Sequence, residues 1–239
     1  DLVISETKGQ AVGFGRVRWE DQPLCRTYVL TGYVLPEQRR KGIGQALLAW
    51  QEERARAIAG EQPAQAPGFL HINATQFQPG IHFLAQQAGY GIKESWALMV
   101  RPSLDDIPDI PLPEGLETRP ALPEHLPLIW RAMQEAYVPE GGPPPSDKIP
   151  EETRTSPTFQ PELWQVAWDV RSDQVVGSVM TYIHHAENRH LGIRRGYTEG
   201  ISTVPGWRRR GVARALIVRS LQAQRLAGMT ESALVCNVE

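Results

Sequence analysis

The chain has 239 residues, of which 41% are hydrophobic and 22% are charged, the composition of an ordinary globular protein. Its formal net charge of −2 argues against a general nucleic-acid or polyanion binder, and no apolar run approaches the ~20 residues of a membrane-spanning helix. Cys25 and Cys236 lie far apart, which disfavours a disulfide framework or a cysteine-built metal site. No signal-like segment opens the chain. We therefore expect a cytoplasmic protein that binds neither membranes nor nucleic acid.

A proline-rich stretch near the middle predicts two domains. Prolines fix φ and lack an N–H, so their density over residues 102–115 is incompatible with a helix or a central strand. We predict an N-terminal domain at 1–102, a linker at 103–114 and a C-terminal domain at 115–239. Asp1 begins directly on a strand pattern and Glu239 ends just after one, so we expect both domains to be truncated at the outer chain ends.

Hydrophobic spacing predicts alternating strands and helices in both halves. The elements expected in the first half are strands at 10–19, 27–34, 69–72 and 96–100 and helices at 42–54 and 81–88. The elements expected in the second half are strands at 116–118, 163–170, 175–184, 197–204 and 232–238 and helices at 123–137 and 211–226. This order indicates an α/β class with mixed sheets.

An internal repeat is the most informative feature of the sequence. Residues 34–48 align without gaps on residues 203–217, sharing a proline, an Arg-Arg pair, a glycine and an Ala-Leu pair. In each copy a predicted strand precedes the segment and an amphipathic helix follows it. Glycine allows a tight turn and close approach to a ligand, and the first amides of a helix attract anions. Both copies therefore predict a phosphate or pyrophosphate cradle.

The motifs Arg39-x-x-Gly42-x-Gly44 and Arg208-x-x-Gly211-x-Ala213 resemble the acetyl-CoA signature of the GNAT acetyltransferase superfamily. The resemblance implies two GNAT-like domains, with acetyl-CoA as co-substrate. The residues that it assigns to acetyl-CoA binding are Val34, Leu35, Arg39, Arg40, Lys41, Gly42, Ile43 and Gly44 in the first copy, and Ser202, Thr203, Val204, Arg208, Arg209, Arg210, Gly211, Val212 and Ala213 in the second.

The resemblance also implies a carboxylate base on the strand before the cradle. Glu199 has this position in the second half, and strand alternation puts it on the same face as Tyr197 and Ile201. In the gapless alignment Leu30 replaces it in the first half, so we expect only the second domain to be catalytic. A solvated acid at a strand start is the ordinary alternative for Glu199. The family's general acid would lie beyond Glu239.

Acetyl transfer to a primary amine of a small molecule or peptide is the predicted function. A non-catalytic acyl-CoA-binding or scaffold protein is the alternative. A tandem thiol-cofactor synthase of the same superfamily is a narrower alternative. No metal site is predicted, because neighbours such as His184 and His185 face opposite ways on a strand and no Cys or Asp cluster joins them.

Overall fold

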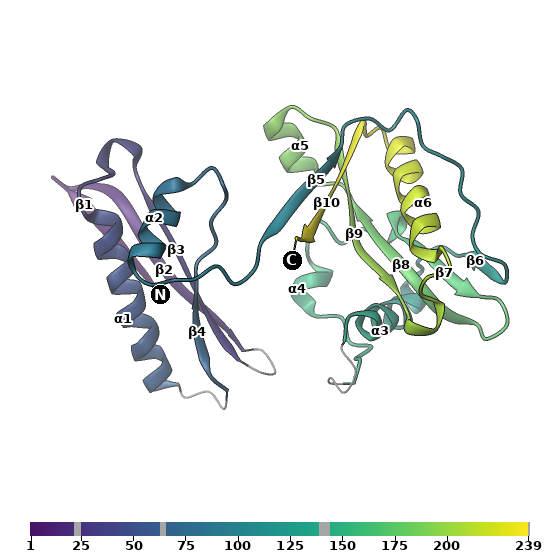
Figure 1. Cartoon of the computed structure of the whole chain (residues 1–239), viewed down its shortest axis with the longest axis horizontal. Coiled ribbons are helices and arrows are strands. Elements are labelled where there is room, and N and C mark those ends of the chain that lie inside the picture. Colours follow the sequence, from purple (N-terminus) through teal and green to yellow (C-terminus); the bar gives the residue numbers. More distant parts are fainter. Residues whose placement is uncertain (22–24, 63–65, 139–143, 239) are drawn as a thin grey trace. The chain divides into compact units, whose positions relative to one another are not determined.

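The computed structural model describes residues 1–21, 25–62, 66–138 and 144–238, and the chain divides into two compact units, Asp1–Lys93 and Glu94–Glu239 (Figure 1). Each unit contains one β-sheet with parallel and antiparallel pairs and with helices against it. The mixed α/β class predicted from the sequence is therefore confirmed. Within the described ranges, no helix is long and apolar enough to cross a membrane.

The first unit is a four-stranded sheet in the order β1-β2-β3-β4. The β1/β2 and β2/β3 pairs are antiparallel, and β3/β4 is parallel. The strands are β1 (Leu2–Thr7), β2 (Gln10–Asp21), β3 (Arg26–Val34) and β4 (Gly68–His71), and the helices are α1 (Ile43–Glu61) and α2 (Pro79–Gln87).

Helix α1 covers one face of this sheet. Its apolar stripe, with Leu48 and Ile58, packs on Val17 and Leu30 of the two central strands. Gln51 of the same stripe is buried, and its Nε2 donates to the carbonyl oxygens of Arg16 (2.9 Å) and Thr31 (2.8 Å). These contacts fix which face of β3 is turned toward the helix.

The second unit is a six-stranded sheet in the order β5-β10-β9-β8-β7-β6, in which only the β10/β9 pair is parallel among the described residues. The strands are β5 (Trp96–Arg101), β6 (Leu116–Thr118), β7 (Gln165–Asp169), β8 (Gln174–Tyr182), β9 (Arg195–Thr203) and β10 (Glu231–Asn237). The helices are α3 (Leu126–Tyr137), α4 (Glu151–Arg154), α5 (His185–Leu191) and α6 (Val212–Leu226).

Helices lie on both faces of this second sheet. Strand alternation divides β7 accordingly, because Val166 and Trp168 pack toward α3 whereas Ala167 packs toward α6. Ile129 is the fully buried residue of α3, and Leu216 is its counterpart on α6. The site described below lies on the α3 face.

The boundary between the units differs from the predicted one. Strand β5, which the sequence placed in the first domain, pairs antiparallel with β10 in the second sheet, where its backbone groups find partners. The following proline-rich segment lies along the second unit: Leu104 is 2% exposed and donates its N–H to Thr230 O, and Arg219 Nη1 donates to Ile110 O. The segment lacks regular structure, as its prolines predict, but it is anchored rather than free.

Two short helices were not predicted. Helix α4 lies inside a Pro- and Gly-rich stretch, and α5 begins where the strand pattern was expected to continue to His184. His184 is the N-cap of α5, with its Nδ1 accepting the N–H of Glu187 at 3.1 Å. The pair His184–His185 thus starts a helix rather than ending a strand.

Candidate active site

The two repeated loops have the same backbone conformation. Each begins with a short 3₁₀ turn, Pro36–Gln38 in one and Pro205–Trp207 in the other. Each then contains an arginine and a glycine in the left-handed region, Arg40 (φ 61°) and Gly42 (φ 82°) or Arg209 (φ 62°) and Gly211 (φ 89°). The gapless alignment therefore corresponds to one local structure formed twice.

Both loops present the first amides of a helix without a side-chain cap. Gly42 and Gly211 are the N-caps, and neither helix start has a side-chain cap hydrogen bond. In the two helices the first backbone N–H groups with an α-helical acceptor are those of Ala46 and Ala215. The N–H groups just before them point out of the helix end and can bind a ligand. A Cβ added at either glycine would meet nothing within 4 Å. This open, electropositive end fits a pyrophosphate.

The first arginine of each motif braces its loop. Arg39 Nε donates to Val34 O at 3.0 Å, and Arg208 Nε donates to Thr203 O at 3.2 Å. Arg208 Nη2 also donates to Ala136 O of α3 at 2.8 Å. These two guanidinium groups thus hold the strand end and the loop together. Their predicted contact with acetyl-CoA stays a prediction, as it does for the other cradle residues.

Strand β9 has an extra residue just before the second loop. Ser178 pairs with Ser202 and Met180 pairs with Glu199, so one residue of β8 faces two residues of β9. Gly200 within this bulge has φ 56°, which favours glycine. Strand β3 of the first unit pairs with β2 in unbroken register over the same region. The bulge turns Glu199 onto the α3 face, together with Met180.

The bulge corrects two details of the sequence interpretation. Tyr197 does share a face with Glu199, since it stacks on Tyr182 next to the Met180–Glu199 pair, but Ile201 packs with the α6 cluster on the other face. Leu30 packs against α1, and the residue of β9 that faces α6 in the same way is Thr198. The gapless alignment therefore slips by one residue upstream of the bulge.

Glu199 lies where β9 and β10 part. The ladder between these strands ends at the pair Tyr197–Ala233, and beyond it Glu199 Oε1 accepts the N–H of Val235 at 2.9 Å. Partial burial raises the pKa of Glu199 above the ordinary value for a glutamate, although the Val235 hydrogen bond acts in the opposite direction. A carboxylate with a raised pKa is suited to accept a proton from a substrate.

The Tyr182 hydroxyl lies close enough to the Glu199 carboxylate for the two groups to interact electrostatically. Burial, together with the charge of Glu199, raises the pKa of Tyr182 to about 12. The Tyr182 hydroxyl therefore stays protonated at neutral pH and can act as a hydrogen-bond donor. Tyr137 of α3 donates its hydroxyl to Ile201 O at 2.8 Å, which ties α3 to the bulged strand.

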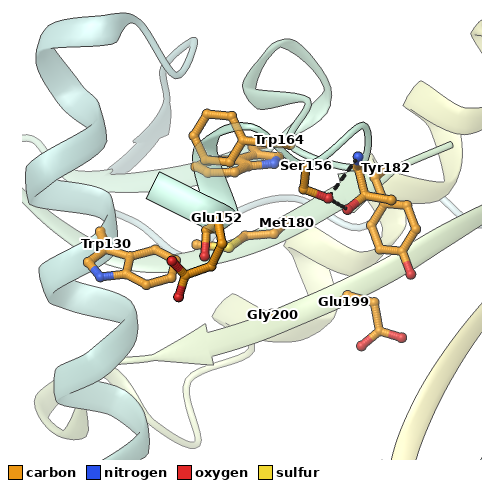
Figure 2. A pocket seen from close by; sticks show the side chains of 11 residues that line it. Trp130, Glu152, Ser156, Trp164, Met180, Tyr182, Glu199 and Gly200 are labelled. Carbon is orange, nitrogen blue, oxygen red and sulfur yellow. Dashed lines mark hydrogen bonds between the residues drawn. The ribbon is translucent and has the colours of Figure 1, made fainter. Parts of the chain in front are cut away.

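Glu199 and Tyr182 line a cavity of about 430 Å³ on the α3 face (Figure 2). Its lining residues come from α3, α4, the segment after α4 and strands β8 and β9, and they are Trp130, Glu152, Thr153, Ser156, Thr158, Phe159, Trp164, Met180, Tyr182, Glu199 and Gly200. Aromatic rings and a thioether form most of the wall, and two carboxylates face the space. The cavity can hold a small organic cation next to the part of β9 that leads into the cradle loop.

Of the lining residues, the sequence identified only Glu199 as functional. Glu152 follows a Pro150-Glu151 pair, which is a helix-start signal that could have predicted α4, but no local signal indicates which face of the fold α4 approaches. No sequence signal indicates that Tyr182 is functional, because its nearness to Glu199 depends on the β8/β9 register. Among the described residues, no group of three or more His, Cys, Asp or Glu side chains is arranged to hold a metal ion.

Comparison with known proteins shows that this chain is similar to acetyltransferases. Residues 1–92 match the family model described as an acetyltransferase (GNAT) domain. The chain is 32% identical over 156 residues to a mycothiol acetyltransferase of Geodermatophilus obscurus, covering 63% of this chain and 46% of that protein. It is 26% identical over 237 residues to that of Cellulomonas flavigena, covering 96% and 64%. The chain thus spans about half to two thirds of these curated relatives.

Solved structures show the same fold. A GCN5-related N-acetyltransferase from Sphaerobacter thermophilus matches with a TM-score of 0.75 and 24% identity, over 97% of this chain and 69% of that chain. A tandem GNAT protein from the clavulanic acid biosynthesis pathway matches with a TM-score of 0.62 and 16% identity, over 98% and 73%. Residues 1–92 are therefore similar to GNAT acetyltransferase domains, and the chain shares its fold with a GCN5-related N-acetyltransferase.

Proposed function

We propose that this chain is part of an N-acetyltransferase that moves an acetyl group from acetyl-CoA to a primary amine, with the reaction in the second unit. The observation that carries the proposal is the position of Glu199, which lines an aromatic cavity from a bulged strand that leads into a cradle loop. The two GNAT-like domains would be in tandem, and because β5 pairs with β10, the first would end at about Lys93 and the second would begin at Glu94 rather than at 115.

Acetyl-CoA is the co-substrate in this proposal, and the second cradle would hold its pyrophosphate. The amides from Arg209 to Ala213 supply hydrogen-bond donors, and the surrounding arginines supply positive charge. Arg210 is kept near the loop by its guanidinium, which lies 4.8 Å from the centre of the Trp207 ring. The backbone of Ser202, Thr203 and Val204 would line the path of the pantetheine along β9.

Glu199 is the proposed base. A primary ammonium group has a pKa of about 10, so it must lose a proton before nitrogen can attack the thioester carbon. Glu199 would take this proton directly or through water. The C–N bond then forms and the C–S bond breaks. Of the two protons that nitrogen loses overall, one ends on the thiol sulfur and the other in solvent.

The relatives support a narrower form of the proposal. The curated proteins that match this chain over its greater part are named mycothiol acetyltransferases. An acceptor related to mycothiol is therefore our second candidate, more specific than a general small-molecule or peptide amine. Turnover with a mycothiol-related amine and none with unrelated amines would support it.

Glu199→Gln in the full-length protein is the test of the general proposal. Glutamine keeps the shape and can still accept the Val235 N–H, but it has no useful basicity. We expect kcat to fall by about 100- to 10,000-fold, with partial recovery at high pH where free amine is abundant, and with little change in acetyl-CoA affinity. Wild-type kcat across the pH range would show that Glu199 is not the base. Binding of acetyl-CoA by the wild-type protein without turnover of any amine would support the non-catalytic alternative.

A further inference from the structure

A second carboxylate lines the Glu199 cavity from a different element. Glu152 belongs to α4, whereas Glu199 belongs to β9. Figure 2 shows Glu152 on the side of Trp130 and Glu199 on the side of Tyr182, with Met180 between them in the view. Across the described ranges, the Glu152 carboxylate has no ion-pair partner, whereas many other acids of this chain pair with arginines.

The turn that carries Glu152 is closed by hydrogen bonds between its own residues. Arg154 N donates to Pro150 O, and Thr155 donates both its N–H and its hydroxyl to Glu151 O at 2.9 Å. Immediately after the turn, the hydroxyls of Ser156 and Thr158, both lining the cavity, lie 2.7 Å apart. The Glu152 backbone therefore has a defined local conformation, and its side chain lines the cavity.

The rest of the lining favours a cation. Phe159 packs edge-on against Trp164 with ring centres 5.2 Å apart, and these rings form an apolar wall together with Met180. No lysine or arginine is among the described residues that line the cavity. Two carboxylates, with no basic residue among the described lining residues, give the space a negative potential, and aromatic faces add to the attraction for a cation.

We propose that Glu152 binds a second hydrogen-bond donor of the acceptor, an ammonium or a hydroxyl group, while Glu199 faces the reacting amine. This inference rests on the proposed function and adds the acceptor class to it. The acceptor is an amine with a donor at its far end and without a carboxylate or phosphate group there. An anionic group at that end would meet the Glu152 charge, and we expect this repulsion, screened because Glu152 is exposed, to weaken binding about 10-fold.

The test uses four acceptors of equal length: a four-carbon diamine, the amino alcohol, the simple alkylamine and the amino acid. Steady-state kinetics of the full-length protein with acetyl-CoA compare Glu152→Gln with the matched control Glu151→Gln, which changes the neighbouring exposed acid that does not line the cavity. Because Glu152 is exposed and water screens its charge, we expect Glu152→Gln to raise KM for the diamine about 3- to 10-fold, with kcat and the KM of acetyl-CoA within about 2-fold. The amino acid should become a better acceptor, and the alkylamine should not change.

The amino alcohol separates the two kinds of donor. If the natural donor is a hydroxyl, Glu152→Gln retains the amino alcohol because an amide oxygen still accepts, whereas Glu152→Ala loses it. Calorimetric titration of the four compounds in the presence of CoA gives a second readout that requires no turnover. Glu152-dependent diamine binding by a protein that acetylates no amine, a mycothiol-related amine included, would overturn the proposed function and keep this inference. Equal behaviour of wild type, Glu152→Gln and Glu152→Ala toward all four compounds would overturn the inference.

Discussion

The strands that lead into the two cradle loops differ by one residue, although the loops themselves are alike. Strand β3 keeps continuous register with β2, whereas β9 has an extra residue at the Glu199–Gly200 bulge. The loop conformation is set locally, by residues such as Gly42 and Gly211 at the helix start. The direction of the carboxylate is set by the bulge. A unit can therefore keep a cradle for an anion and still have no group positioned for proton transfer.

The residues around the two loops also differ, because acidic side chains line the cavity of the second unit and, among the described residues, none lines the cavity beside the first loop. On β3, Leu30 is part of the core beneath α1, and its neighbour Thr31 is exposed and uncharged. The cavity beside the first loop has a volume of about 520 Å³, and its described lining contains Lys41 and Trp50 but no acid. The second unit has two acids in its cavity. The comparison predicts that the second unit alone carries out the chemistry.

Charge placed at the two cradles should have very different effects. Gly211→Glu puts a carboxylate at the open helix start, and we expect acetyl-CoA binding to the second unit to weaken about 100-fold or more, measured by calorimetry. The matched change Gly42→Glu in the full-length protein should leave kcat within about 2-fold. Gly211→Ala is the control for backbone strain at φ 89°, because it adds no charge. Complete loss of turnover in a folded Gly42→Glu variant would break the comparison.

The bulge itself can be tested with glycines of the two strands. Gly200→Ala forces a residue with φ 56° to carry a Cβ 3.0 Å from Met180 Cγ. We expect a loss of about 1–3 kcal/mol in the free energy of unfolding and a kcat about 10- to 100-fold lower, because Glu199 shifts with the bulge. Gly32→Ala meets Phe14 O at 3.3 Å and needs no left-handed backbone, so we expect a change within about 1 kcal/mol. Urea titration and steady-state kinetics measure both. Unchanged kcat in Gly200→Ala would separate the bulge from catalysis.

The features that could be predicted from the sequence are those that depend on residue patterns within one element or loop. The repeated loops, both long helices that follow them and the mixed class follow from glycine positions and hydrophobic spacing, which act over a few residues. The position of β5 depends on a partner strand, β10, more than a hundred residues away in sequence. The bulge depends on the register of β8 against β9, and a one-residue slip reverses the face of every upstream side chain. For this reason Ile201 was put on the wrong face, whereas Glu152 was missed because no local signal indicates which face of the fold α4 approaches.

The bracing arginines give a smaller matched pair. Arg208→Ala removes hydrogen bonds to Thr203 O and Ala136 O, and we expect KM for acetyl-CoA to rise about 10-fold, because a hydrogen bond from a charged group contributes about 1.5–3 kcal/mol and solvent exposure reduces that amount. Arg39→Ala removes the equivalent bond to Val34 O in the first unit and should leave turnover unchanged. An equal effect of the two variants on KM would contradict the assignment of turnover to the second unit alone.

The smallest expected effect concerns the pH dependence of stability. Partial burial raises the pKa of Glu199 in the folded chain above its value of about 4.3 in the unfolded chain. Between these two pKa values the folded state binds more protons, so the wild-type protein loses stability as pH rises through the raised pKa. Glu199→Gln does not titrate there. The variant should therefore be more stable than wild type at about pH 8, and the difference should vanish at about pH 4.

Hydrogen exchange can assign this difference to one unit. The change should appear in amides of β9 and β10, including Val235, whose N–H bonds to Glu199. Amides of α1 and β3 should exchange alike in both proteins, since β3 has no acid between Thr27 and Val34. A Glu199→Gln variant that is less stable than wild type at about pH 8 would mean that the Val235 hydrogen bond outweighs burial in setting the pKa. Glu199 would then have a structural role, joining β9 to β10 through Val235 where the two strands separate. The two units would in that case differ in strand geometry rather than in the presence of a catalytic base.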